Sequence, residues 1–381
     1  GCLLTLGASL LNPYGPRVFE LFVPYVRSSL AVLGASPPAG QLAIAEWKPT
    51  WQALTEPPYS PFWLLALVLL AMASFALRGR RVSLPLVSSA IVLGVLGMLA
   101  IRHLLPFAAA LVAMIVINDR ERRREADVDG EAPVERILDS VVGRIAVSTL
   151  VVILGGGLLF SVLTDGFYVG RDLPYRTGVG FDPALVPEGA VRWLATRDSP
   201  ENVFNNFDSG AYLLYRLYPR YLPYDDARVV DPEHFERTRR AVEDPLAFDR
   251  MVTDDAIGTV VLVHPSPESV TLLPRLERDP RWRLVFRDHN STVHVRTDLP
   301  EPSAVRNPPS LPPTEEPLGR AIDGALAHLK LAELPAAELT DAFVSGLLGD
   351  IERERQAYVR ARSIAPGNRR VRAYFGDDSR M

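Results

Sequence analysis

The stretch that decides the predicted fold is Ile145-Ala-Val-Ser-Thr-Leu-Val-Val-Ile-Leu-Gly-Gly-Gly-Leu-Leu-Phe-Ser-Val-Leu163. It holds no charged residue, and similar apolar runs precede it at Phe62–Leu77, Leu84–Ile101 and Leu104–Ile117, whereas nothing comparable follows Asp165. A spanning helix needs roughly 20 mostly apolar residues, because its backbone must satisfy its own hydrogen bonds in lipid. We therefore expect a membrane α-helical bundle within residues 62–164, followed by an extramembrane part.

Whole-chain averages conceal this division, with 48% hydrophobic residues, 23% charged residues and a net charge of -4. The near-neutral balance and the lack of a clustered basic face argue against a nucleic-acid partner. Cys2 is the only cysteine, which excludes a disulfide framework and a cysteine zinc site. The spacing of the histidines indicates no metal site either.

The arginines next to the apolar runs predict the orientation, because short cytoplasmic loops are enriched in Lys and Arg. A helix over 84–117 would be about 50 Å long, too long for one crossing of a core of about 30 Å. We therefore expect a hairpin that turns at Arg102-His103, a cytoplasmic loop over 119–143 and export of everything after Asp165. The arginines that support this orientation are Arg78, Arg80, Arg81, Arg120, Arg122, Arg123 and Arg124.

The start of the chain, residues 1–12, has the pattern of the end of a further span, so we expect an N-terminally truncated fragment. Residues 13–61 would then form an external loop rich in proline and aromatic residues. One interpretation makes these residues an interfacial belt and a stiff loop. The other makes Arg17, Glu46 and Lys48 a polar site that contacts a lipid phosphate or a sugar donor.

Arg102 and His103 lie at the expected outer turn of the hairpin. An ionisable group near membrane depth is costly and suggests a function, here contact with the phosphate of a lipid carrier. The alternative is snorkelling, in which the side chain only reaches for lipid headgroups.

Residues 165–298 alternate between helical and strand patterns, which predicts a small extracytoplasmic α/β domain. The first strands should be parallel, and the last two should be antiparallel across the turn Asp288-His-Asn-Ser291. The expected helices cover 188–196, 209–218 and 269–278, and the expected strands cover 202–207, 258–263, 282–286 and 292–296.

A proline-rich linker over 299–317 precedes a helical tail, residues 318–381. In this tail Tyr358, Ala361 and Pro366 have the spacing of the second helix of a tetratricopeptide unit. The first helix fits less well, with Ala342 where glycine is common. Such a helical hairpin could bind a protein partner, or it could simply cap the domain.

One phrase, Asn202-Val-Phe-Asn-Asn-Phe-Asp-Ser-Gly-Ala-Tyr-Leu-Leu-Tyr-Arg-Leu-Tyr-Pro219, resembles the exported domain of bacterial multi-span proteins related to GT-C glycosyltransferases, which include the protein mannosyltransferases. Those relatives carry Asp-Gly-Arg soon afterwards, where this chain has Asp225-Asp-Ala-Arg228. Resemblance extends to Asn12-Pro-Tyr-Gly15, Glu46-Trp-Lys-Pro49 and Arg102-His-Leu-Leu-Pro106.

The resemblance implies sugar transfer from a polyprenyl-phosphate donor to a protein or lipid at the outer face of a bacterial inner membrane, with the C-terminal domain in the periplasm. It also implies a catalytic carboxylate in an early external loop, so no catalytic residue is assigned in this chain. The signature positions have a structural interpretation, and Asp225 with Asp226 could chelate a divalent cation. These positions are Asn205, Asp208, Gly210, Tyr212, Asp226 and Arg228.

Two functions from different classes follow. The chain could be the C-terminal part of a glycosyltransferase whose exported domain shapes the acceptor site. Alternatively, it could be a non-enzymatic, membrane-anchored module that presents its α/β domain and helical repeat to protein partners.

Overall fold

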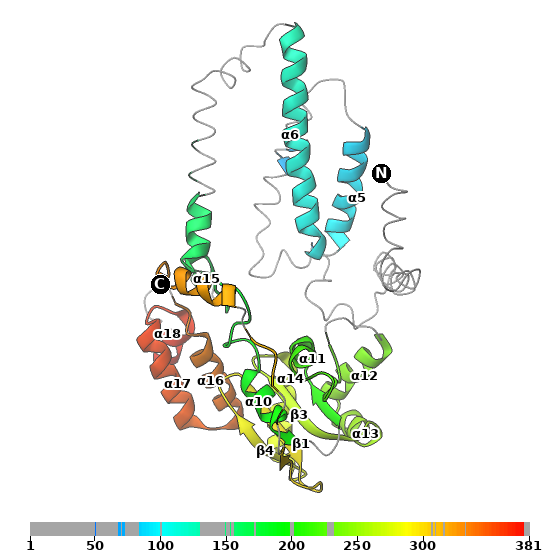
Figure 1. Ribbon diagram of the computed structural model, residues 1–381, viewed down its shortest axis with the longest axis vertical. Coiled ribbons are helices and arrows are strands. Elements are labelled where there is room, and N and C mark those ends of the chain that lie inside the picture. Colours follow the sequence, from blue (N-terminus) through cyan, green and yellow to red (C-terminus); the bar gives the residue numbers. More distant parts are fainter. Residues whose placement is uncertain are drawn as a thin grey trace. The chain divides into compact units, whose positions relative to one another are not determined.

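The computed structural model of the protein is shown in Figure 1. It divides into two units, residues 1–146 and 147–381. The structure describes residues 84–99, 101–129, 156–170, 173–198, 202–226, 232–305, 310–314, 317–331 and 333–376, together with residues 50, 68, 69, 71, 72, 149, 153 and 308.

In the first unit, α5 (Leu84–Leu99) and α6 (Leu104–Asp129) flank a short 3-10 turn, η4 (Ile101–His103). The two helices pack closely because glycines of α5 make room for the ring of Phe107. A Cβ atom at Gly94 or Gly97 would lie 3.2 or 3.3 Å from that side chain. The chain thus reverses direction at the residues where the sequence analysis expects a turn.

The expected membrane bundle is wrong. Within the described ranges, no helix combines the length and the apolar character needed to cross a membrane. α5 has 16 residues, and α6, although it has 26, is mostly charged from Asp119 onward, whereas a crossing needs roughly 20 mostly apolar residues. Residues 1–12 and 130–143, most of the loop at 13–61 and of the run at 62–77, and residues 145–148, 150–152 and 154–155 of the last run lie outside the described residues.

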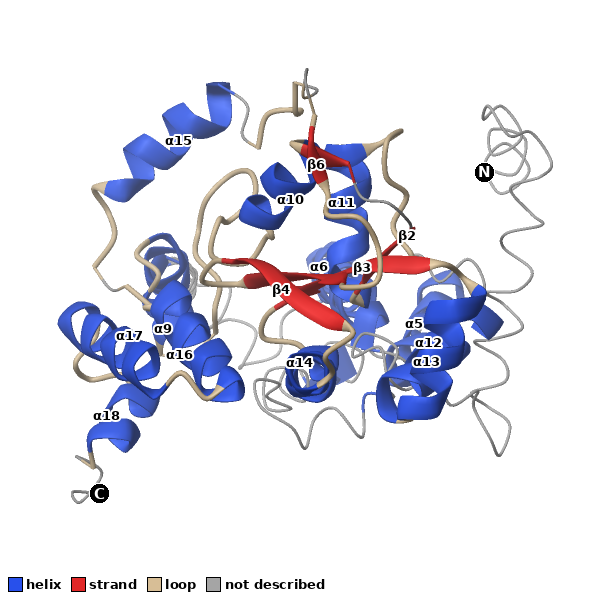
Figure 2. Ribbon diagram, turned by 90° about the horizontal axis from the view of Figure 1, so that it is seen from below, coloured by secondary structure: helices blue, strands red, loops and turns tan. Residues whose placement is uncertain are grey.

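The second unit is built on a four-stranded sheet in the order β2-β3-β5-β4 (Figure 2). β2 (Asn202–Asn205) and β3 (Ile257–Val263) are parallel, whereas β5 (Ser291–Arg296) is antiparallel to both β3 and β4 (Trp282–Arg287). Every residue of β3 is buried, which explains why this central strand is an unbroken apolar run. These strands match the predicted positions and directions.

Helices cover both faces of the sheet (Figure 2). α10 (Glu188–Ala195) and α11 (Gly210–Leu217) pack with Val261 on one face. The other face packs with Val260 and Leu262 and carries α12 (Pro232–Glu243), α13 (Pro245–Asp254) and α14 (Pro267–Arg278). Successive side chains of β3 therefore enter two different cores, as expected from the alternation along a strand.

The helices that follow the two parallel strands lie on opposite faces of the sheet. β2 leads through η5 (Phe207–Ser209) to α11 on one face, and β3 leads to α14 on the opposite face. In α/β sheets this divergence marks the edge where ligands usually bind.

Two short strands join the start of the proline-rich stretch to the α/β domain. β1 (Arg197–Asp198) pairs antiparallel with β6 (Ser303–Ala304). The amide of Val305 then donates to the carbonyl of Thr196 at 2.9 Å. The segment that follows β6 therefore starts beside the C-terminal end of α10. Upstream, residues 156–163 are helical and lead to the short helix α9 (Gly166–Val169).

The tail contains α15 (Pro317–Ala327), α16 (Ala336–Leu348), α17 (Ile351–Ile364) and α18 (Arg369–Phe375). Gly349 ends α16 with a φ of 72°, a left-handed cap that glycine adopts readily. Asp350 then caps α17 by accepting from the amide of Arg353. Val344 of α16 is buried in the core formed with α13 and α14, so the tail is anchored to the α/β domain.

Candidate functional site

A buried ion pair joins α10 to α11. Arg216, which is only 4% exposed, donates to both carboxylate oxygens of Glu188, with Nη2 lying 3.1 Å from Oε1. The hydroxyl of Tyr212 and Nε of Arg192 also donate to this carboxylate, each at 2.8 Å. Burial alone would raise the pKa of Glu188, but these hydrogen bonds outweigh it and hold the pKa below its ordinary value.

The proline-rich segment lies over this pair. Leu311 packs against the apolar cluster beneath α10 and α11, and the hydroxyl of Tyr215 donates to the carbonyl oxygen of Pro313 at 3.0 Å. An open space of about 490 Å³ remains between the segment and the helices. Its polar walls are Glu188, Arg192, Thr196 and Arg216, and its other wall is Pro308 with residues 311–314.

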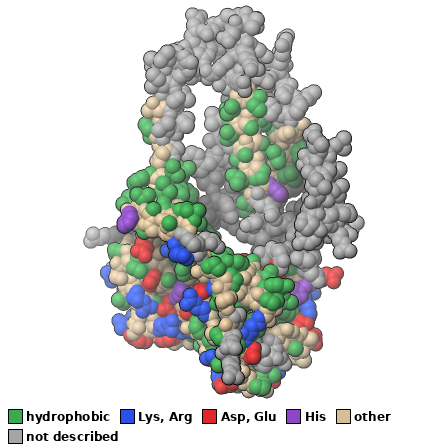
Figure 3. Space-filling view, in the orientation of Figure 1, with side chains coloured by type: hydrophobic (Ala, Val, Ile, Leu, Met, Phe, Trp, Pro, Cys, Tyr) green, Lys and Arg blue, Asp and Glu red, His purple; other side chains and the backbone are tan. Residues whose placement is uncertain are grey.

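Aromatic side chains extend the groove along α11. The ring of Phe181 lies 4.9 Å from the ring of Tyr212 and 5.6 Å from that of Tyr215. Phe181, Tyr215 and Tyr218 are all exposed. Hydrophobic side chains gather around α11 on the visible face (Figure 3). We call the surface formed by Phe181, Tyr215, Glu188, Arg192, Thr196 and Arg216, against which the proline-rich segment lies, the α10–α11 groove.

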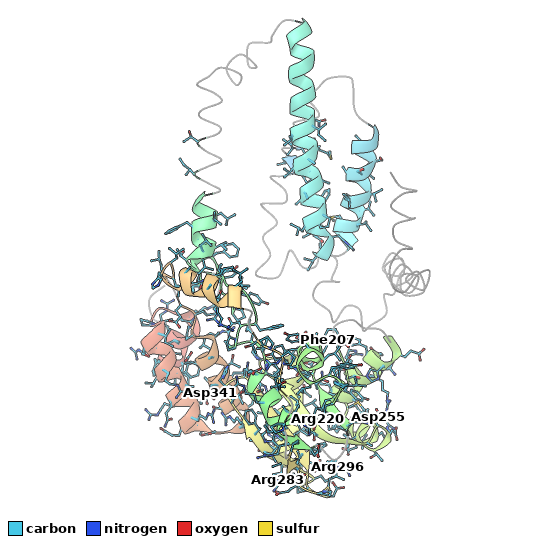
Figure 4. The ribbon with its side chains drawn as sticks, viewed as in Figure 1. Phe207, Arg220, Asp255, Arg283, Arg296 and Asp341 are labelled. Carbon is cyan, nitrogen blue, oxygen red and sulfur yellow. The ribbon has the colours of Figure 1, made fainter. Side chains whose placement is uncertain are left out.

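Arg220, labelled in Figure 4, fixes the end of this groove. Its guanidinium group donates to the carbonyl oxygens of Ala195 and Arg197 at 3.0 and 2.7 Å. It also forms an ion pair with Asp198 at 2.6 Å. α11 is thereby held to β1, the strand that pairs with the start of the proline-rich segment.

Residues 202–219, which carry the resemblance to GT-C-related proteins, include β2 and the residues at its carboxyl end. The Asn205 side chain accepts from the amide of Tyr224 and donates to the carbonyl of Asp225, at 2.8 and 2.9 Å. Asn206 bonds both backbone groups of Val263 and so ties β2 to the end of β3. A Cβ atom at Gly210 would lie 2.0 Å from the carbonyl oxygen of Asp225, so only glycine permits this approach.

Acidic residues gather at the same edge. Asp225 is buried, and burial raises its pKa to about 6 despite the nearby imidazole of His234. Asp226 donates its amide to the Asp225 carboxylate at 2.9 Å, and Asp208 in η5 is exposed. For the cation expected at Asp225 and Asp226, the described residues contain no group of three or more potential ligands.

A second buried polar cluster lies where the sheet meets α14 and α16. Nε2 of His264 is 3.1 Å from the hydroxyl of Thr292, and Nε2 of His294 is 2.9 Å from the Glu277 carboxylate. The Nδ1 atoms of both histidines and Nε of Arg287 have no hydrogen-bond partner among the described residues. Burial first, and then the charges of His294 and Arg287, lower the pKa of His264 to about 3.

The structure brings together Asn205, Gly210 and Asp226, and it buries Tyr212 in the ion-pair network. His103 and Arg102 lie in η4 of the other unit. Arg17, Glu46, Lys48 and Arg228 lie outside the described residues.

The sequence analysis missed Glu188, Arg216, Tyr215 and the proline-rich segment as parts of one site. The one available signal was the pattern Pro308-Pro-Ser-Leu-Pro-Pro313, which is typical of polyproline II segments. Comparison of the chain with models of protein families, with curated proteins and with solved structures found no match.

Proposed function

We propose that the C-terminal unit is a polypeptide-recognition module that binds a partner chain in the α10–α11 groove. One observation carries this proposal: a proline-rich stretch of the chain that is neither helix nor strand over residues 310–313 already lies on the groove, held by Tyr215 and Leu311. A surface that accepts one such stretch has the shape and the hydrogen-bond donors needed for another.

The chemistry of the groove supports the same function. Tyrosine and arginine are the residue types most enriched at the energetic centres of protein interfaces. Tyr215 offers an exposed ring next to Phe181, and Arg192 offers an exposed cation. The buried pair of Arg216 and Glu188 gives these side chains a rigid base, which lowers the entropy lost on binding.

Selection of random linear peptides on the full chain tests this proposal. Peptides that bind the wild-type protein should lose at least about 30-fold in affinity for the double variant Phe181→Ser/Tyr215→Ser, because each aromatic anchor contributes about 1 to 2 kcal/mol. The matched control is Leu246→Ser, an equally simple loss of an exposed apolar side chain on α13, on the opposite face of the sheet. Equal binding to both variants, or no selected peptide, would contradict the proposal.

A second proposal rests on the resemblance of residues 202–219 to GT-C-related proteins. In a GT-C-like glycosyltransferase that modifies proteins, the same groove would hold the acceptor polypeptide, and a polyprenyl-phosphate sugar would be the donor. The observation in its favour is the groove itself, since an extended acceptor needs such a surface. Sugar incorporation into a protein acceptor should show a raised KM for the acceptor in Phe181→Ser/Tyr215→Ser. Failure to transfer sugar from any of a panel of donors would count against this proposal.

A further inference from the structure

We infer that the partner of the α10–α11 groove is a proline-rich polypeptide with an acidic flank, and that residues 310–314 of the chain compete with it by occupying the groove in cis. This inference rests on the proposed recognition function and names its partner class and its regulation.

The first support is the way the resident segment is held. Residues 310–313 form neither helix nor strand, and the recorded polar contact of this stretch with α11 is the carbonyl of Pro313 on the Tyr215 hydroxyl. Proline lacks an amide proton, so the main chain at each proline of such a ligand can accept hydrogen bonds but cannot donate them. A tyrosine hydroxyl beside exposed rings is the donor that recognition of polyproline II segments uses.

The second support is the apolar packing of Leu311. Leu311 stands between two pairs of prolines and packs against the cluster that contains Val191, Leu194 and Tyr212. A leucine followed by two prolines therefore anchors the segment, while Pro308 and Ser310 are exposed. A partner that carries Leu-Pro-Pro would place its leucine in the same position.

The third support is the charge of the side chains that line the groove. The groove is lined by two arginines, Arg192 and Arg216, and one carboxylate, Glu188, so its walls carry a net charge of about +1 by this count. Both arginines pair with Glu188, so one positive charge remains, and solvent reaches it at the exposed guanidinium group of Arg192. In the sequence, Glu315 and Glu316 follow Thr314. A peptide that has carboxylates after its prolines would complement this charge.

Cis occupancy has a measurable consequence. A tethered segment acts at an effective concentration on the order of millimolar, so it competes well with a free peptide. If the groove is open in only a tenth of the molecules, the apparent affinity for a partner falls about tenfold. Weakening the resident segment should therefore strengthen binding in trans.

The test uses the full chain and a labelled peptide with the sequence of residues 304–317, followed by fluorescence anisotropy. Leu311→Asp in the protein removes the apolar anchor of the resident segment and should tighten peptide binding by about tenfold. The matched control is Ser310→Asp, which adds the same charge at the neighbouring exposed position and should leave the affinity unchanged. Because Leu311 is partly buried, Pro312→Ala/Pro313→Ala serves as a second loosening variant, and thermal melts establish that each variant is folded.

Two changes of the peptide test its chemistry on the Leu311→Asp protein. A peptide with aspartate in place of the leucine should lose at least tenfold in affinity, and a peptide with Glu315→Lys/Glu316→Lys should lose several-fold at low salt and less at high salt. Tyr215→Phe in the Leu311→Asp protein should weaken binding of the unchanged peptide.

Unchanged affinity in both loosening variants would overturn the cis competition, and equal binding of all three peptides would overturn the partner class. If randomly selected peptides bind through Phe181 and Tyr215 while the proline-rich peptide does not bind, this inference fails and the proposed function stands. If no peptide of either kind binds, both fail.

Discussion

Arg353 of α17 donates from Nε to a carboxylate oxygen of Asp341 on α16 at 2.9 Å, and the Asp341 side chain is only 6% exposed. Arg360 donates to the other oxygen at 2.8 Å. From the sheet, Arg287 of β4 approaches the same carboxylate to 3.6 Å. Asp341, labelled in Figure 4, is therefore the charge that holds the tail hairpin together and joins it to the α/β domain.

Asp341→Asn should lower the free energy of unfolding by about 1 to 2 kcal/mol, because the largely buried Arg287 loses a carboxylate partner, whereas water can solvate Arg353 and Arg360, which are 38% and 50% exposed. Urea denaturation measures this change. The matched control is Glu352→Gln on the same tail hairpin, whose exposed pair with Arg355 should contribute nothing measurable. A similar small effect of both substitutions would show that Asp341 does not organise the tail.

Gly210→Ala should destabilise the domain by about 2 kcal/mol or more, because the new methyl group would lie 2.0 Å from the carbonyl oxygen of Asp225 and must force the backbone apart. Gly324→Ala in α15 is the control. Among the described residues, no atom lies within 4 Å of a Cβ atom at Gly324, so the better helix propensity of alanine should stabilise it by up to about 1 kcal/mol. Thermal unfolding separates the two signs, and a stabilised Gly210→Ala protein would refute the close approach.

The strands were predictable because their signals are local. The apolar run of β3 marks a buried strand, and Asp288 forms the β4–β5 turn by accepting from the amides of Asn290 and Ser291. α12 and α13 were not predicted, because Phe235 and Phe248 are separated by many charged residues. The apolar runs were interpreted as spans from hydropathy and length alone. In α6 the apolar part ends at Asp119, so length and apolar character do not coincide.

The candidate site was not predictable because its contacts are distant in the chain. Arg216 and Glu188 are 28 positions apart, and Tyr215 and Pro313 are 98 apart. No periodicity links such residues, and only the fold brings them together. The signature residues were different: Asn205 and Gly210 were expected to be structural, and the structure gives each a structural contact with the loop at Asp225.

Asp225→Asn should stabilise the protein at neutral pH. Burial raises the pKa of Asp225 from 3.8 to about 6, so the folded state disfavours the charged carboxylate. The resulting loss of folding stability grows as the pH rises from about 4 to about 6 and is complete above pH 6. A shift of about two units corresponds to at most about 3 kcal/mol. Asparagine can still accept from the amide of Asp226, so we expect a gain of about 2 kcal/mol at pH 7.5 that shrinks toward zero at pH 4. A gain that does not depend on pH, measured by urea denaturation, would rule out this cause.

His264 should give the opposite pH dependence. Its pKa is lowered from 6.5 to about 3, because burial and the charges of His294 and Arg287 disfavour the protonated ring. The Thr292 hydroxyl and the nearby His294–Glu277 pair offer it no carboxylate of its own. Its contribution is therefore complete above pH 6.5 and is lost as the pH falls toward 3, by about 1.4 kcal/mol per unit.

His264→Gln keeps a polar atom near Thr292 but cannot be protonated, so the unfolding free energy of this variant should fall less steeply between pH 6.5 and pH 4.5 than that of the wild type. The difference should reach at most about 2.7 kcal/mol at pH 4.5. At pH 8 both proteins should share the same slope with pH, because the imidazole is neutral in the folded and unfolded states. A wild-type slope that survives in both His264→Gln and His264→Asn would assign the acid sensitivity to another group.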